Sequence, residues 1–273
     1  NRLTPATLEV INELVVKSAV DLGLENGKKL RVDTTVVETD IHYPTDSTLL
    51  WDTVLVVTRL VGKLDDLLPR GVPGFTNRNR SARRRMQEIQ RMTPKDRHRR
   101  LIPKYRELIR TTEQVVGNAR EVLKNTERIH SIDLMSDIAI NAVRKEIGHY
   151  CGLGDHVIDQ ARRRVLDGER VPNEDKIFSI FETHTDLIKR GKILKPVEFG
   201  HKAYIAESAR GLITQYRVLD GNPSDEGHVE PSLMRHQETF GDVPSVYSGD
   251  RGFFSQGNVD HCRDAGVELV CIP

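Results

Sequence analysis

The sequence contains few cysteines, few aromatic residues and no long hydrophobic run. Its three cysteines, Cys151, Cys262 and Cys271, lie far apart and form no CxxC pair, which argues against both a zinc knuckle and a disulfide framework. No apolar run approaches the roughly 20 residues that cross a bilayer, and the first residues form no signal peptide. We therefore expect a protein of the reducing cytoplasm that has no membrane partner.

Two kinds of ligand site are also missing from the sequence. No GxxxxGK[ST] phosphate loop is present, so ATP use is not supported. The ten histidines show no His-x3-His spacing, which makes zinc a poor candidate. The acidic residues therefore remain as candidate metal ligands.

The charge of the chain is distributed very unevenly. Its formal net charge is +1, but 13 Lys or Arg residues stand against 3 Asp or Glu between Arg78 and Arg110. The rest of the chain has 28 basic and 37 acidic residues. A concentrated basic segment gives a protein sequence-independent affinity for phosphate backbones. A solvated basic helix face is the alternative interpretation.

The N-terminal region predicts a helix followed by a strand. Apolar spacing indicates a helix over residues 5–22, opened by a proline in its first turn. Alternating apolar residues predict a half-buried strand over 30–36. Asp33 therefore lies in the middle of a strand, on its polar face.

A long helical pattern follows, from Ser47 to about Asp186, with breaks near 69–74 and 168–172. Inside it a 4-3 spacing predicts a long helix packed in coiled-coil fashion. This seam consists of Leu101, Tyr105, Leu108, Thr112, Val115, Ala119, Val122, Thr126 and Ile129. It either packs within the helical segment or joins two copies of the chain.

Strand patterns return in the C-terminal third. The expected elements are a hairpin of strands at 197–205 and 212–219, a helix at 229–240, a strand at 245–248, a helix at 255–265 and a strand at 267–272. This order predicts an α/β fold, a mixed sheet interrupted by a large all-helical insertion.

Two aspartates stand out by their positions. Asp33 is in the first strand, and Asp250 ends a later one; they are separated by 217 residues. If the two strands are neighbours, the carboxylates meet at one point and form a hard-oxygen site suited to Mg²⁺ or Mn²⁺. For an arbitrary aspartate, a turn cap or a surface charge is the usual role.

Three ordered motifs carry a family resemblance. They are RVDTTVVETDIHYPTDS at 31–47 with LLWD at 49–52, then SIFETHT at 179–185, KRGK at 189–192 and PVEFGHK at 196–202, and finally YSGDRGFF at 247–254. Together they resemble bacterial insertion-sequence transposases of the DDE class, which have a ribonuclease H-like core. On this resemblance we expect a helical lead-in at 1–29, a first part of the core at 30–50, the helical insertion at 51–186 and the remainder of the core at 187–273.

The resemblance implies metal-dependent phosphodiester hydrolysis at insertion-sequence ends, followed by strand transfer into target DNA. Asp33 and Asp250 would be catalytic and would hold Mg²⁺ or Mn²⁺. The partners implied are double-stranded DNA, as transposon ends and target, and a second copy in a homodimer, in the nucleoid-associated cytoplasm of a bacterium. The residues expected to contact DNA are Arg78, Arg80, Arg83, Arg84, Arg85, Arg97, Arg99, Arg100 and Lys202.

Several alternatives stay open from sequence. Lys202 is either near the substrate or an edge-strand lysine that discourages aggregation. The family's third acid, usually a Glu on a helix, is expected beyond Pro273, because Glu268 falls inside a strand; the fragment is then expected to be catalytically incomplete. The main alternative function is a non-catalytic DNA-binding remnant or regulator derived from a transposase, and a nuclease or resolvase on the same core is a weaker one.

Overall fold

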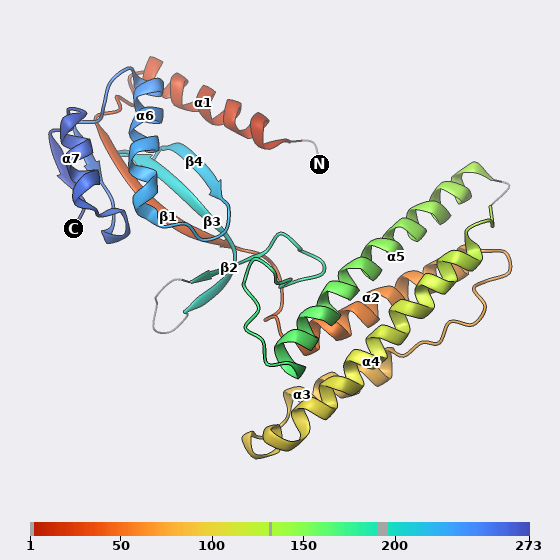
Figure 1. Cartoon of the computed structure of the whole chain (residues 1–273). Helices are drawn as coiled ribbons and strands as arrows, with labels where there is room; N and C mark the ends of the chain where they lie inside the picture. The colour runs from red at the N-terminus through yellow and green to blue at the C-terminus, as the bar shows by residue number, and fades with distance from the viewer. Residues whose placement is uncertain (1–2, 131–132, 190–195) are drawn as a thin grey trace. The chain divides into compact units, whose positions relative to one another are not determined.

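The computed structural model, shown in Figure 1, describes residues 3–130, 133–189 and 196–273. The fold is mixed α/β, and the chain divides into two compact units. We call Asn1–Thr39 with Asp186–Pro273 the sheet unit and Asp40–Thr185 the helical unit. Part of the KRGK motif, from Arg190 onward, lies outside the described residues.

Apart from β2, the sheet unit contains strands and helices in the order expected. Its elements are α1 (Pro5–Asp21), β1 (Lys29–Glu38), β2 (Asp186–Lys189), β3 (Val197–Ser208), β4 (Ile213–Leu219), α6 (Val229–Phe240), β5 (Val246–Ser248), α7 (Gln256–Asp264) and β6 (Leu269–Cys271). Short 3-10 turns lie at Asp225–His228 and Arg251–Phe253. The predicted hairpin and the alternating helices and strands after it are confirmed.

The strands form one mixed sheet in the described part of the chain. Its order is β2-β3-β1-β5-β6, and β4 also pairs with β3. Neighbours β1, β3 and β4 run antiparallel, whereas β5 is parallel to both β1 and β6. Helix α6 connects β4 to β5, and α7 is the crossover between the parallel strands β5 and β6.

One face of this sheet is buried under α6 (Figure 1). Leu30 and Val32 of β1 pack there with Tyr204 of β3 and Leu233 of α6. Two-residue alternation along β1 places Asp33 on the other face, where it is exposed. The expectation that Asp33 points to the polar face of its strand is therefore confirmed.

The helical unit consists of α2 (Asp46–Leu67), α3 (Asn79–Gln90), α4 (Pro94–Thr126) and α5 (Leu134–Ala161), which continues into a π turn at Arg162–Leu166. The predicted seam is buried inside this unit from Tyr105 to Thr126, against α2 and α5. Of its two possible roles, packing within the helical segment is the one observed. No helix in the described part of the chain is long and apolar enough to span a membrane.

Two details of the helical prediction are wrong. The predicted break at 168–172 is present, with a positive φ of 69° at Gly168 and Pro172 shortly after it, but residues 173–185 beyond it form turns rather than the expected helix. Asp186–Lys189 is a strand, β2, which pairs with the first residues of β3. Its four residues were too few to show an alternating pattern.

Candidate functional site

Asp33 lies on β1, and Asp250 follows the neighbouring parallel strand β5 by two residues. The register between β1 and β5 pairs Leu30 with Tyr247 and Arg31 with Ser248. Asp33 and Asp250 each lie two residues beyond the last pair of this register, Arg31 with Ser248. The same register, continued past β5, would set these two residues, 217 positions apart in sequence, side by side.

Each aspartate is tied to the backbone next to it. Asp33 Oδ1 accepts a hydrogen bond from the Thr34 amide at 2.7 Å. Asp250 caps the short 3-10 turn that follows β5, and its Oδ1 accepts from the Gly252 amide at 2.8 Å. Each carboxylate is therefore oriented by the backbone beside it.

A third carboxylate, that of Asp225, faces the Asp250 turn. A Cβ placed on Gly252 would lie 2.5 Å from Asp225 Oδ2 and 3.0 Å from Asp250 Oδ1. Oxygens from two aspartates thus approach the same point beside Gly252. Asp225 was not predicted from sequence, because GNPSDE at 221–226 indicates only a turn after a strand.

Lys202 is engaged inside the protein. Its Nζ lies 2.7 Å from Asp225 Oδ1 and donates to the Pro223 carbonyl at 2.7 Å. The residue is only 7% exposed and belongs to β3, which has strands on both sides. The interpretation of Lys202 as an edge-strand lysine is therefore wrong, since β3 is interior. A buried, ion-paired ammonium is also poorly placed to reach a DNA phosphate.

The chemistry of these side chains fits a hard divalent cation. Mg²⁺ is commonly held by one or two protein carboxylates together with waters and substrate phosphates. Asp33 on β1 and Asp250 after β5 provide such a pair. Within 3–130, 133–189 and 196–273, no three His, Cys, Asp or Glu side chains gather into a complete metal centre by themselves. All three cysteines are free thiols.

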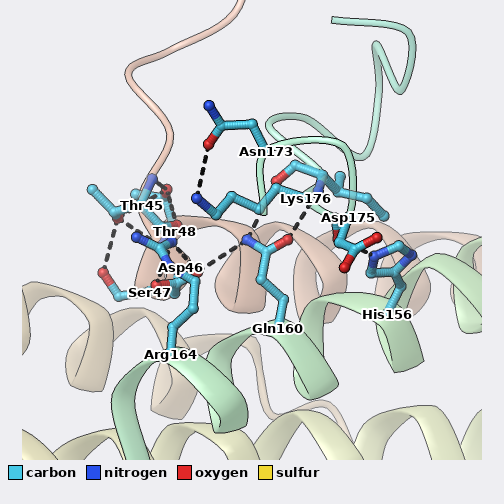
Figure 2. A network of polar contacts seen from close by, with 11 residues as sticks. Thr45, Asp46, Ser47, Thr48, His156, Gln160, Arg164, Asn173, Asp175 and Lys176 are labelled. Carbon is cyan, nitrogen blue, oxygen red and sulfur yellow. Dashed lines mark hydrogen bonds and ion pairs between the residues drawn. The ribbon is translucent and has the colours of Figure 1, made fainter. Parts of the chain in front are cut away.

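The PTDS part of the first motif serves the helical unit instead. Thr45 caps α2, and Asp46, which is 6% exposed, accepts from Arg164 Nη1 at 2.9 Å and from Gln160 Nε2 at 3.0 Å (Figure 2). Gln160 also accepts from the Ile177 amide at 2.8 Å. This network joins the start of α2 to the end of α5 and to the turns after it. These motif residues therefore have a structural role.

Asp52, in the LLWD part of the same motif, is a buried acid. It lies 3.2 Å from His42 Nε2, and its side chain is 6% exposed. Burial raises the pKa of Asp52 to about 6 from an ordinary 3.8, and the nearby His42 partly opposes this shift. The native state therefore holds this proton more tightly than the unfolded chain does.

Asp52→Asn is expected to change how the stability of the helical unit depends on pH. Because the folded pKa is raised, the contribution of Asp52 is fully present below about pH 4 and is lost as pH rises through 6. Between pH 4 and 7, the free energy of unfolding of the wild type should fall by on the order of 2 kcal/mol more than that of the variant. Urea unfolding followed by fluorescence of Trp51, the only tryptophan, measures this. Parallel pH profiles for the two proteins would contradict it.

The predicted DNA-contacting arginines lie on α3 and on the start of α4. Arg80, Arg83 and Arg84 are exposed on α3, and the α4 residues Arg97, Arg99 and Arg100 are exposed as well. Arg83 lies over the Trp51 ring at 5.8 Å, and Trp51 Nε1 donates to Asn79 Oδ1 at 2.8 Å.

The other two arginines are half-buried. Arg85 Nε lies 3.3 Å from Glu107, and Arg78 is also partly covered. We define the basic hairpin as α3 with residues 94–100 of α4. Six of the eight predicted arginines are thus available on its surface.

Comparison with protein-family models, with curated proteins and with solved structures gives no match to this chain. The family resemblance carried by the three motifs therefore stays a prediction. The function is inferred below from this chain's own residues and their positions.

Proposed function

We propose that this chain is part of a DDE-class transposase of a bacterial insertion sequence, with a ribonuclease H-like core formed by the sheet unit. The observation that supports the proposal is the parallel pairing of β1 with β5, which ends at Arg31 and Ser248, two residues before Asp33 and Asp250 respectively. The mixed sheet, with β4, β3 and β1 antiparallel and β5 and β6 parallel to β1, is the kind of α/β sheet that the resemblance implies.

Asp33 and Asp250 are the residues that would hold Mg²⁺ or Mn²⁺. A metal bound there supplies activation of the attacking oxygen and stabilisation of the leaving oxygen in phosphodiester hydrolysis and strand transfer. The protein's part is to fix two carboxylates at the end of a rigid parallel strand pair. The backbone bonds from Thr34 and Gly252 restrict both side chains before any ligand arrives.

The basic hairpin is the proposed contact for double-stranded DNA. Its exposed arginines would contact phosphates and would not recognise the base sequence. Such contacts suit a protein that must bind both transposon ends and target DNA. The proposed active assembly is a homodimer in the bacterial cytoplasm. Because the heptad seam is used within the helical unit, the dimer contact must lie elsewhere.

The test of the metal site is Mn²⁺ calorimetry on the whole chain. Asp33→Asn and Asp250→Asn should each weaken Mn²⁺ binding by at least about 10-fold, because each removes a charged oxygen ligand. Asp242→Asn is a matched control: Asp242 is exposed and, like Asp33, accepts from the next residue's amide, at 2.8 Å. It should leave binding unchanged.

The second candidate function is a non-catalytic DNA-binding remnant or regulator. The basic hairpin favours it, since that surface does not depend on the aspartates. Mn²⁺ binding that neither Asp33→Asn nor Asp250→Asn reduces would support this candidate and remove the metal site from the proposal.

A further inference from the structure

Asp225 contacts the surroundings of both candidate catalytic aspartates. It begins the 3-10 turn Asp225–His228, between β4 and α6. Its Oδ1 accepts from Thr34 Oγ1 at 2.9 Å, and Thr34 is the residue next to Asp33 on β1. Its Oδ2 would lie 2.5 Å from a Cβ placed on Gly252, whose amide donates to Asp250. The Thr34 side chain is on the buried face of β1, opposite to Asp33, so Asp225 lies between that face and the turn that follows β5.

Lys202 offsets the repulsion between the carboxylates of Asp225 and Asp250. Like charges within a few ångströms disfavour each other, so Asp225 and Asp250 would otherwise repel. The Lys202 ammonium, 2.7 Å from Asp225 Oδ1, compensates the Asp225 charge from within the sheet. Its second bond, to the Pro223 carbonyl, fixes the loop that carries Asp225. Since Lys202 is buried, water does not screen the pair strongly.

We infer that Asp225 is a positioning residue for the metal site, held by Lys202, and that its hydrogen bond to Thr34 of β1 fixes it beside Gly252, where it orients the turn that carries Asp250. This inference rests on the proposed function. It assigns Lys202 to the support of the site, in place of the DNA contact expected from sequence. Outer residues that orient metal-binding side chains usually matter about 10- to 100-fold for metal affinity.

The first test is Asp225→Asn in the whole chain. The asparagine amide has the shape of the carboxylate but carries no negative charge, so it holds Lys202 and Thr34 less strongly. Mn²⁺ affinity should therefore fall by about 10-fold. Circular dichroism must show that the variant is folded, because it leaves the Lys202 ammonium buried without its counter-ion. An unchanged affinity in the folded variant would overturn the inference.

Gly252→Ala tests the same contact and leaves the Lys202–Asp225 pair chemically intact. The added Cβ would lie 2.5 Å from Asp225 Oδ2 and 3.0 Å from Asp250 Oδ1, so both carboxylates must shift relative to the turn. Mn²⁺ affinity should again fall by about 10-fold. Gly257→Ala is the matched control, because the nearest atom to its Cβ, Ser255 Oγ, is 3.9 Å away. Equal affinities for both glycine variants would count against the inference.

A double variant separates positioning from a general loss of structure. If Asp225 acts through Asp250, then Asp225→Asn should reduce Mn²⁺ affinity in the wild type and have no further effect on Asp250→Asn. Equal additional losses in both backgrounds would refute the positioning role. Failure of Asp250→Asn alone to weaken binding would instead refute the proposed function, so the two failures are distinguishable.

Discussion

Replacing Arg97, Arg99 and Arg100 together by serine is expected to weaken binding of double-stranded DNA by about 100-fold or more at 0.1 M salt. Each phosphate contact releases a counterion and contributes about 0.9 to the slope of log affinity against log salt. Loss of three contacts should therefore reduce that slope by about 2.7. Fluorescence anisotropy of a labelled duplex over a salt series measures both quantities.

The choice of these three arginines follows from their surroundings. Arg97, Arg99 and Arg100 are exposed at the start of α4, whereas Arg85 is held by Glu107 within the hairpin. An arginine already paired with a carboxylate contributes less to phosphate binding, because its charge is compensated. The exposed set is thus expected to account for most of the salt dependence.

The control removes the same charge from another surface. Lys17, Arg210 and Arg263 are exposed residues of the sheet unit, and their replacement by serine also lowers the net charge by three. That variant should keep nearly all of its DNA affinity and slope. Equal losses in the two triple variants would mean that only net charge matters, and the basic hairpin would then be an ordinary solvated helix face.

Sequence patterns were sufficient for most of the sheet unit because its elements are regular. The alternation at 30–36 marks β1, and the helix at 229–240 coincides with α6. The meeting of Asp33 and Asp250 could be stated only as a condition, because strand pairing is decided by packing and not by the pattern of one strand. The pairing of β1 with β5 meets that condition.

Long-range polar contacts could not be predicted from the sequence. Asp225 is one of 40 acidic residues, and its importance depends on Lys202 and Thr34, which are distant in the chain. The position of Lys202 within the sheet was misjudged for a similar reason. An isolated strand pattern does not reveal whether it has one neighbour or two, and β3 has strands on both sides.

Gly200→Ala is expected to destabilise the sheet unit by about 3 kcal/mol, near the upper end for overpacking. Gly200 lies in β3 where it pairs with Glu38 of β1 on one side and with Asp186 of β2 on the other. An added Cβ would lie 2.1 Å from the Val37 carbonyl oxygen and 2.8 Å from Glu38 Cα. Those are backbone atoms, so a side-chain rotation cannot relieve the clash.

The strands themselves must therefore separate at this point. Hydrogen exchange should become faster at the Thr39 amide, which donates to the Phe199 carbonyl at 3.1 Å. Thermal unfolding followed by circular dichroism gives the loss of stability, with Gly257→Ala as the control in open space. Wild-type stability and exchange in Gly200→Ala would show that the close approach of β1 to β3 is not needed.

The same variant tests how strongly the candidate site depends on the sheet. Gly200 is near the carboxyl end of β1, and Asp33 lies earlier in that strand, opposite Ile205. If only the end of β1 separates, the pairing of β1 with β5 persists and Mn²⁺ affinity should stay within about threefold of the wild type. A larger loss in a folded protein would mean that β1 moves as a whole, since strand ends usually open locally at lower free energy than the core.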